Sequence, residues 1–483
     1  MKKTSLLFMM LLSIMTATMA QTVSVGAFNK SFNILETQNA KIVGTYNGHY
    51  LAVTNNYSGF FRCLNCMVLE IDDNMNIVRQ IEFQDTKGDE VSAASLYEGK
   101  VYVLLTHETR NEMTFKRYVV DVASLQLNGD PTVIHKYETV RKDRVYHWVA
   151  QSPDKSLTGL VNIVLNKKND NFTAVEMLLD EEMNVEWRQE YQIRAMDDLM
   201  VTNDGELITM GKTVQTRGEA SKIFLTHLDA DNAQDFSQTI DISIDRVKLI
   251  SYKNGKILAM AMGISVGDKR SFKYCGIAYD IPKNEANVSY RTLTDEEKCV
   301  VYNYKTGGTT REIYSDFMTL TGCEATSEGG AFSIRLIRGV TTCNSQGQCN
   351  TVFYGFGSIL VGINSNGDVV WHHPIRSYCK NNGVDFFIRS AICESDGNVY
   401  YLQSENPKWG ESYNIAKKAA KLNPMKGSKA LGIYRVTPDG GISKSVQPLE
   451  KKLTLTSEIH NIDNTHIGFL TLRKGVSMLK MKF

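Results

Sequence analysis

The hydrophobic pattern of this chain repeats one motif eight times. In each repeat an apolar run leads into a short polar turn, usually with glycine, and a second apolar run follows, as in residues 97–104 (YEGKVYVL) and 395–402 (SDGNVYYL). The turns centre on eight positions: Gly48, Gly99, Lys155, Gly205, Gly255, Gly330, Gly397 and Thr465. Up to Gly255 the spacing is about fifty residues, the period of a β-propeller, in which each repeat supplies one blade of several strands.

Two further apolar segments follow each hairpin and complete a four-stranded unit. The third segment ends in an acidic or amide turn, as in residues 117–122, 175–182 and 358–367. The fourth is shorter and more polar, as in NVEWRQEY (184–191). Inner strands packed between neighbouring blades should be almost continuously apolar, whereas an outer strand should alternate. The pattern therefore predicts an all-β fold with a single propeller.

The two ends of the chain indicate how the ring closes. The eighth unit stops after VSMLKMKF (476–483), which supplies a third strand and no fourth. The strand-like residues 24–35 come before the first hairpin and belong to no unit. An open propeller would expose two sheet edges, so we expect the N-terminal strand to close the last blade. Eight blades result; the alternative is seven blades, with one weak unit as a decoration.

The first twenty residues have the features of a signal peptide. Lys2 and Lys3 precede an apolar stretch from Leu6 to Met15, and Ala20 closes a cleavage site of small residues. We therefore expect residues 1–20 to be removed and residues 21–483 to form the propeller domain, with insertions at 296–316 and 406–429. The linker 296–316 reads as extended, and the centre of 406–429 as a lysine-rich helix. An exported protein would reside in the periplasm, on the outer cell surface or outside the cell.

Charge narrows the classes of partner. Loss of Lys2 and Lys3 lowers the formal net charge from +1 to −1, which favours neither nucleic acid nor an anionic membrane as partner. No later apolar run reads as a transmembrane segment. The expected partner is a protein, a peptide or a glycan.

The nine cysteines suggest one disulfide. Cys343 and Cys349 bracket a hairpin tip, so we expect them to be bonded as a loop staple. Cys63-Leu-Asn-Cys66 has the spacing of a redox dithiol, but a strand follows it where such motifs normally meet the start of a helix, which disfavours a redox role. Cys323 and Cys393 occupy matching positions in the sixth and seventh units and are expected near each other.

A carboxylate stands just before the innermost strand of most units. Innermost strands begin at the same face of a propeller, so these side chains should ring one mouth of the central channel and focus negative potential there. The third unit carries a different set at this point, Arg144, Tyr146 and His147. The predicted carboxylates are Glu90, Asp198, Asp245, Asp316, Asp385 and Glu458.

Two explanations of this carboxylate ring remain open. Asp and Glu also end strands and cap turns, which would make the placement structural. If the ring is functional, it should bind a cation or a cationic group of a ligand, and its oxygen-only ligands would suit Ca²⁺. No other cofactor is expected, and the metal, if there is one, is not specified by the sequence.

Two short segments carry a resemblance to known propellers. Ser152-Pro153-Asp154 resembles a turn of bacterial periplasmic propellers, and residues 366–371 (NGDVVW) resemble an outer-strand turn of quinoprotein-like blades. On these segments the chain is similar to uncharacterised secreted β-propeller proteins of Bacteroidetes-type bacteria. The resemblance implies the fold and supplies no active-site residues.

Two functions are compatible with the sequence. The favoured one is a non-catalytic binding or scaffold propeller that presents its channel-mouth face to a peptide, glycan or protein partner, because no catalytic motif is recognisable. The alternative is a carbohydrate-active hydrolase or lyase that uses two channel-mouth carboxylates with Arg144, Tyr146 or His147. Whether the protein is an enzyme is left undecided by the sequence.

Overall fold

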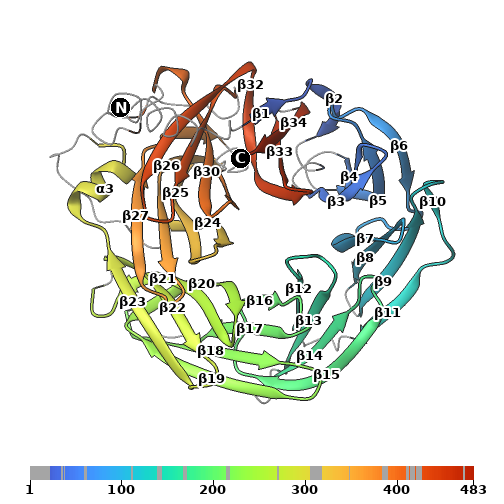
Figure 1. The fold of residues 1–483 in the computed structure, drawn as a ribbon, viewed down its shortest axis with the longest axis horizontal. Helices are drawn as coiled ribbons and strands as arrows, with labels where there is room; N and C mark the ends of the chain where they lie inside the picture. The colour runs from blue at the N-terminus through green and yellow to red at the C-terminus, as the bar shows by residue number, and fades with distance from the viewer. Residues whose placement is uncertain are drawn as a thin grey trace, which may run out of the picture.

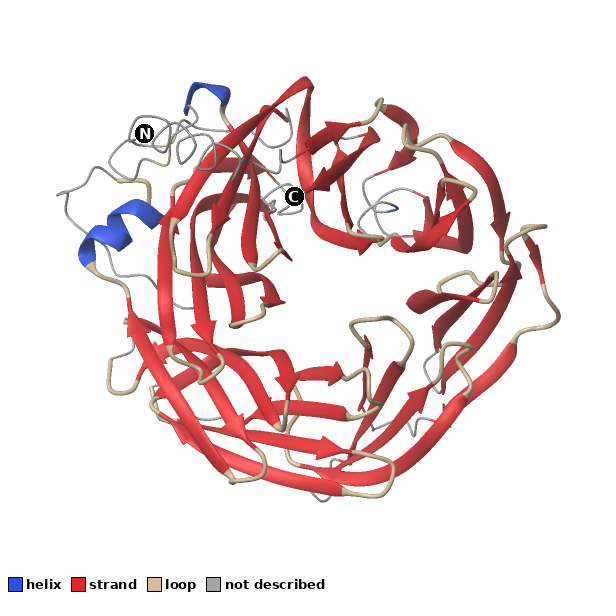
Figure 2. Cartoon of the chain, in the orientation of Figure 1, coloured by secondary structure: helices blue, strands red, loops and turns tan. Residues whose placement is uncertain are grey.

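A computed structural model gives the structure of the chain. It describes residues 22–33, 36, 39–58, 62–109, 112–138, 144–166, 171–213, 218–268, 271–304, 318–346, 349–382, 390–409, 413, 419, 427–471 and 474–483. The predicted signal peptide and the centre of the second insertion lie outside this set. The described chain is almost entirely β and forms a ring of radially arranged sheets around a central axis (Figures 1 and 2).

The first half of the ring holds four blades, each with its innermost strand earliest in the sequence. Blade 1 comprises β3 (Lys41–Tyr46), β4 (His49–Ser58), β5 (Arg62–Ile71) and β6 (Ile77–Glu82). Blade 2 comprises β7 (Glu90–Tyr97), β8 (Lys100–Glu108), β9 (Glu112–Asp121) and β11 (Thr132–Glu138), with the short β10 (Gln126–Leu127) beside β9. Blade 3 comprises β12 (Arg144–Gln151), β13 (Thr158–Asn166), β14 (Asn171–Leu179) and β15 (Val185–Ile193). Blade 4 comprises β16 (Asp198–Val201), β17 (Leu207–Lys212), β18 (Ser221–Leu228) and β19 (Ala233–Ile240).

The second half follows the same order. Blade 5 comprises β20 (Ile242–Lys253), β21 (Lys256–Ser265), β22 (Phe272–Asp280) and β23 (Glu285–Thr292). Blade 6 comprises β24 (Met318–Ala325), β25 (Gly329–Cys343), β26 (Cys349–Asn364) and β27 (Val369–Ile375), and β28 (Cys379–Asn382) pairs with the far end of β26. Blade 7 comprises β29 (Ser390–Ser395), β30 (Asn398–Glu405), β31 (Ser428–Val436) and the first part of β32 (Ile442–Ile462).

One long strand joins the last two blades. The first part of β32 pairs with β31, and its second part pairs with β33 (Thr465–Thr471) as the innermost strand of blade 8. The two blades therefore share one continuous eight-stranded sheet. Among the described residues the strands form seven hydrogen-bonded sheets, which contain eight four-stranded units.

The N-terminal strand closes the ring, as predicted. β1 (Thr22–Val25) pairs antiparallel with β34 (Lys474–Lys482), with Thr22 opposite Lys482 and Val25 opposite Leu479. β2 (Asn29–Asn33) continues the pairing at the other end of β34. An ion pair also ties β34 to blade 1: Lys480 Nζ on β34 lies 2.6 Å from a carboxylate oxygen of Asp73. The first and last blades are thereby held together.

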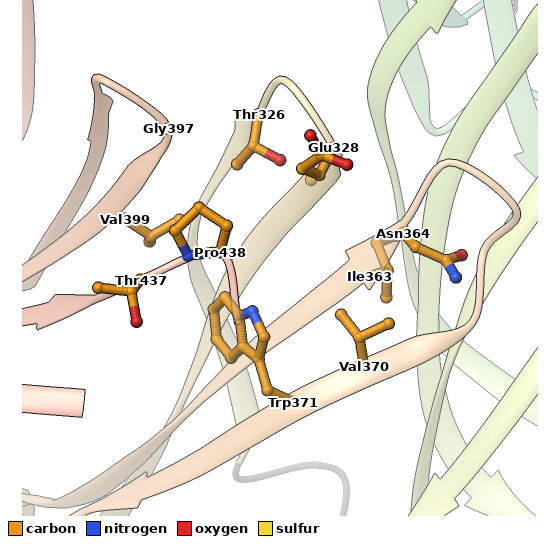
Figure 3. Close-up of a pocket in the computed structure, with 11 residues that line it drawn as sticks. Thr326, Glu328, Ile363, Asn364, Val370, Trp371, Gly397, Val399, Thr437 and Pro438 are labelled. Atoms are coloured by element: carbon orange, nitrogen blue, oxygen red, sulfur yellow. The ribbon is translucent and has the colours of Figure 1, made fainter. Parts of the chain in front are cut away.

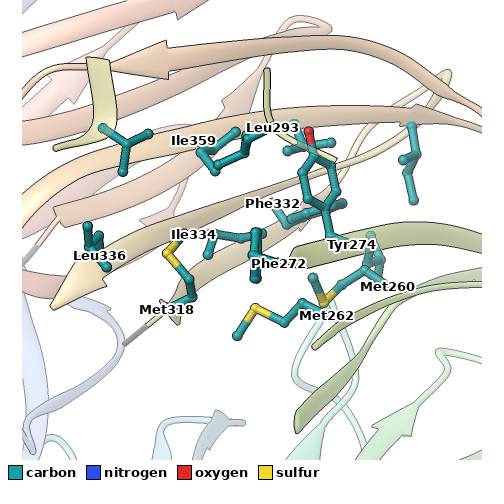
Figure 4. Packing of buried hydrophobic residues seen from close by; sticks show 14 of the residues in the cluster. Met260, Met262, Phe272, Tyr274, Leu293, Met318, Phe332, Ile334, Leu336 and Ile359 are labelled. Carbon is teal, nitrogen blue, oxygen red and sulfur yellow. The ribbon is translucent and has the colours of Figure 1, made fainter. Parts of the chain in front are cut away.

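Apolar side chains fill the spaces between neighbouring blades. Between blades 5 and 6, Met260, Met262 and Tyr274 pack against Phe332 and Ile334 (Figure 4). Outer strands alternate between exposed and partly buried residues, as along β15. Each blade thus buries both of its faces against neighbouring blades. Along the outer strand, exposed residues alternate with partly buried ones.

Six of the eight predicted turn residues adopt the left-handed backbone conformation: Gly48, Gly99, Lys155, Gly205, Gly255 and Gly397. Gly255 has a φ of +74°, and Lys155, which replaces glycine in blade 3, has a φ of +63°. A non-glycine residue is uncommon there and needs support from its surroundings. Lys155 Nζ donates a hydrogen bond of 3.3 Å to the carbonyl oxygen of Ile42 on the innermost strand of blade 1. The lysine therefore links two blades that are not neighbours in the ring.

The first insertion begins as a helix, where we expected extended chain. α3 (Asp295–Val301) starts with a capping box in which the side chains of Thr294 and Glu297 each accept a hydrogen bond from the other's backbone N–H. The box satisfies backbone donors that would otherwise be unpaired at the helix start. Asn303, just after the helix, exchanges two hydrogen bonds with the backbone of Ala419 in the second insertion. No helix among the described residues is long and apolar enough to cross a membrane.

Cys343 and Cys349 lie directly opposite each other at the end of the β25–β26 hairpin. They are paired as a disulfide, with 4.0 Å between their Cα atoms. Within the described part of the chain, the other seven cysteines form no disulfide; they are Cys63, Cys66, Cys275, Cys299, Cys323, Cys379 and Cys393.

Removal of residues 22–33 should open the ring, because blade 8 would lose its outer strand and expose the edge of β34. The melting temperature should fall by far more than the degree or two that about 1 kcal/mol represents in a chain of this size. Calorimetry of the truncated protein tests this, and a synthetic peptide of residues 22–33 should restore much of the loss. A truncated protein that melts with the intact one would refute closure by this strand.

The Cys343–Cys349 bond should hold a hairpin tip and contribute little to the ring. A loop this short gains about 2 kcal/mol at most from chain entropy. Non-reducing peptide mapping of protein from an oxidising compartment should recover the two cysteines in one linked peptide pair. Finding either cysteine alkylated or joined elsewhere would contradict the assignment.

Candidate functional site

The structure describes three of the six predicted mouth carboxylates together with their side chains, and they differ in environment. Glu90 opens β7 and is exposed. Asp245 is the extra residue of a β-bulge in β20 and is also exposed. Asp198 is only 7% exposed. Its carboxylate lies 2.6 Å from Lys248 Nζ and accepts a hydrogen bond of 2.7 Å from the backbone N–H of Leu249. Asp198 therefore joins the innermost strands of blades 4 and 5.

The remaining predicted residues are only partly described. Asp316 and Asp385 lie outside the described residues. Arg144 begins β12 and Glu458 lies in the second part of β32, while their side chains lie outside the described part of the structure. The complete ring of six carboxylates stays a prediction.

Tyr146 and His147 point to opposite faces of β12. Tyr146 is 43% exposed and lies near Trp148, with 6.3 Å between ring centroids. His147 packs edge-on against Phe115 of blade 2, at 5.8 Å. Burial lowers the pKa of His147, and the negative charges of Glu90 and Glu108 only partly oppose that effect. His147 is therefore a neutral imidazole at pH 7, in contact with the neighbouring blade.

A pair of glutamates that the sequence analysis missed faces across the boundary of blades 6 and 7. Gly322 on β24 lies against the side chain of Ile392 on β29, so these two positions face each other. Side chains two residues apart on a strand share a face, which makes Glu324 and Glu394 face each other as well. Glu394 Oε1 accepts a hydrogen bond of 2.7 Å from the backbone N–H of Gly397.

The two glutamates are electrostatically coupled. Burial, followed by the negative charge of Glu394, raises the pKa of Glu324 to about 8. A carboxylic acid that keeps its proton at neutral pH beside a second carboxyl is the arrangement needed for general acid–base work. The sequence did hold a signal for this pair, since Cys-Glu occurs at matching positions, 323–324 and 393–394, before two successive inner turns.

One cavity opens at the other mouth of the ring, where the inner hairpins turn. Its volume is about 850 Å³, within the range of ligand pockets. It is lined by turns and innermost strands from blades 3 to 6, including Gln151, Met200, Asp204, Tyr252, Lys256 and Ser327. Ala325, the residue after Glu324, also lines it.

A smaller pocket of about 250 Å³ lies between blades 6 and 7 (Figure 3). The indole of Trp371 stands beside Pro438 at its floor, and Glu328 and Asn364 supply polar atoms. Gly362 lies against the Trp371 ring, where an added Cβ would clash, and Gly440 packs closely beside Cβ and Cγ of the same tryptophan. The backbone is therefore shaped around the indole.

An aromatic pocket of about 500 Å³ lies beside the first insertion. Tyr302 and Tyr304 stack with 5.4 Å between ring centroids, and Tyr354 stacks with Phe356 at 6.3 Å. Arg338 lines the same pocket. The pocket offers flat ring faces with one cationic group nearby.

Among the described residues, no group of three or more His, Cys, Asp or Glu side chains is placed to hold a metal ion. The Ca²⁺ site considered for the carboxylate ring includes residues that are not described, so it stays a prediction.

No protein-family model matches the sequence, and no curated protein sequence matches it. Among solved structures, the chain is similar to the Dos1 propeller, with 9% identity, 95% of each chain covered and a TM-score of 0.44. It is also similar to the WD40 domain of SCAP from fission yeast, with 7% identity, 96% of this chain and 98% of that chain covered and a TM-score of 0.35. For the polysaccharide lyase Uly1 the identity is 10%, the coverage 81% of this chain and 89% of that chain, and the TM-score 0.36. These likenesses concern the fold only; the ring of four-stranded units described above is by itself that of a β-propeller.

Proposed function

We propose that this protein is a binding propeller that holds a peptide or glycan segment in the cavity of about 850 Å³ at the hairpin-turn mouth of its channel. The single observation that carries the proposal is that turns from four successive blades line one open cavity. This moves the expected binding face from the carboxylate mouth to the opposite mouth. Binding at the carboxylate mouth stays a prediction from the sequence.

The lining chemistry favours a polar, extended ligand. Backbone-rich turns supply amide donors and acceptors, and Tyr252 supplies an aromatic face. Lys256 and Lys253 add positive charge against the single carboxylate of Asp204, while Lys248 is neutralised by Asp198. Hydroxyl- or amide-rich ligands can satisfy such a surface without deep apolar burial, which fits a peptide or sugar chain.

Reversing the charge of Lys256 should weaken ligand binding. Lys256 and Lys100 occupy the same place in their inner hairpins, but only Lys256 lines the cavity. Loss of a favourable polar contact, worth about 1–2 kcal/mol, should raise the Kd of K256E about tenfold, whereas K100E should stay close to wild type. Peptide and glycan arrays followed by calorimetry on the best ligand measure this. Equal effects of the two variants would place the ligand elsewhere.

A second candidate function rests on the glutamate pair. Glycoside cleavage uses one protonated and one ionised carboxyl, and Glu324 with Glu394 supplies groups of this kind next to the cavity lining. On this alternative the protein is a carbohydrate-active hydrolase or lyase. Release of new sugar ends from a polysaccharide, lost in both E324Q and E394Q, would support it. Ligand binding without turnover favours the binding propeller.

The raised pKa of Glu324 predicts a pH-dependent stability. Between the ordinary carboxyl pKa of 4.5 and about 8, the folded chain retains a proton that the unfolded chain releases, so stability falls as the pH rises. This loss should be absent in E324Q. The melting temperature of E324Q, measured relative to that of wild type, should therefore rise between pH 5 and pH 8.5. A gain of a few degrees, corresponding to about 1–2 kcal/mol after allowance for solvent, is expected.

Two variants control that experiment. E394Q removes the neighbouring negative charge and should reduce the pH dependence of wild type in part. E328Q changes an exposed glutamate in the adjacent turn and should leave the dependence as it is. An E324Q profile parallel to wild type would show that Glu324 titrates normally.

A further inference from the structure

A β-bulge in blade 1 brings Cys63 and Cys66 to the same face of β5. In a regular strand, residues three apart point to opposite faces. Here Asn65 pairs with Asn56 and Cys63 pairs with Tyr57, so Leu64 is an extra residue with no partner of its own. An inserted residue reverses the alternation. On a regular strand, a spacing of three residues would place the two thiols on opposite faces. The inserted Leu64 places them on the same face of β5.

The hydrogen bonds around the two sulfurs confirm that they share one environment. Asn55 Nδ2 lies 3.0 Å from Cys63 Sγ and 2.9 Å from Cys66 Sγ. The backbone carbonyl oxygen of Asp89, just before the innermost strand of blade 2, lies 3.4 Å from Cys63 Sγ and 3.8 Å from Cys66 Sγ. The two thiols also hydrogen-bond to each other.

The two thiols are unequal. Cys63 is partly exposed, whereas Cys66 is fully buried. The hydrogen bond from Cys66, assisted by Asn55, lowers the pKa of Cys63 to about 7, although burial opposes it. The same hydrogen bond and burial raise the pKa of Cys66 far above its ordinary value. An accessible thiolate beside a buried protonated thiol is the asymmetry expected of an attacking and a resolving cysteine.

Other titratable groups surround this pair and will shape its pH response. Asp89 is buried, with one carboxylate oxygen 2.5 Å from Nδ1 of the partly exposed His107. Asp89 raises the pKa of both thiols through its charge, as a smaller effect than those named above. Among the described residues, Tyr57 opposite Cys63, the exposed Glu90, and Tyr118, whose pKa is raised by burial and then by the charges of Asp89 and Cys66, also lie around the pair.

We propose that Cys63 and Cys66 form a redox dithiol that reduces accessible disulfide bonds by thiol–disulfide exchange. The Cys63 thiolate attacks one sulfur of the substrate disulfide, forms a mixed disulfide and releases the first substrate thiolate. The Cys66 sulfur then attacks Cys63 Sγ, and the second substrate sulfur leaves with the proton of Cys66. The substrate disulfide gains two electrons, and the Cys63–Cys66 pair loses two and becomes a disulfide.

This activity is independent of the binding function proposed above. The dithiol lies between blades 1 and 2, at the end of the blades where innermost strand β7 begins. The cavity of about 850 Å³ lies at the opposite, hairpin-turn end of blades 3 to 6. Failure of one proposal therefore leaves the other intact.

The test uses full-length reduced protein and the aromatic disulfide 5,5′-dithiobis(2-nitrobenzoate) as probe. Wild type should release two thionitrobenzoate ions per dithiol, and peptide mapping should then show Cys63 joined to Cys66. C66S should release one and retain the adduct on Cys63, while C63S should react at least about tenfold more slowly at pH 7. C379S, which removes a buried thiol elsewhere, should behave as wild type.

A second measurement needs no variant. Pulsed alkylation of folded wild type with iodoacetamide should show Cys63 half-maximally reactive near pH 7, with buried Cys379 unreactive over the same range. Oxidised glutathione and insulin then distinguish small from protein disulfides as substrates. Reaction of Cys63 no faster than an ordinary exposed thiol, or absence of a Cys63–Cys66 disulfide after reaction, would overturn the proposal. So would a Cys63–Cys66 disulfide that forms in air but exchanges with none of the three disulfides.

Discussion

Antiparallel pairing of β1 and β2 with β34 is the interaction on which the rest of this molecule depends. A blade of four strands cannot bury both of its faces alone, and in this ring every blade packs against two neighbours. Without the N-terminal strand, blade 8 would present an open edge, and its contact with blade 1 would lose the support of the outer strand. Closure therefore stabilises every interface around the channel, including those that hold chemistry.

The chemically interesting side chains lie on or beside inner strands at blade boundaries. Glu324 and Glu394 come from blades 6 and 7, Asp198 and Lys248 from blades 4 and 5, and the Cys63–Cys66 pair contacts Asp89 of the next blade. Inner strands of neighbouring blades approach closely while their outer strands diverge. Burial at such a boundary raises the pKa of Glu324.

β-Bulges contribute to this placement. One in β5 aligns the two thiols, one in β20 exposes Asp245, and one in β24 precedes Glu324. Each inserts a residue that re-aims the side chains following it, while the strand as a whole keeps its place in the blade. A repeated scaffold can in this way carry different groups at equivalent positions without losing its interfaces.

The sequence by itself determined the architecture of this protein. Apolar runs and turn residues such as Gly255 marked each inner hairpin, and the lack of a fourth strand after the segment 476–483 identified the N-terminal segment as the closing strand. These features are local in the sequence or depend only on the number of strands, so the sequence alone reveals them. The tertiary structure alone decided that Glu324 faces Glu394, that Asp198 is paired with Lys248, and that Cys63 lies beside Cys66. The first two depend on contacts between blades fifty to seventy residues apart, and the third on a bulge that reverses strand alternation without leaving a mark in the hydrophobic pattern.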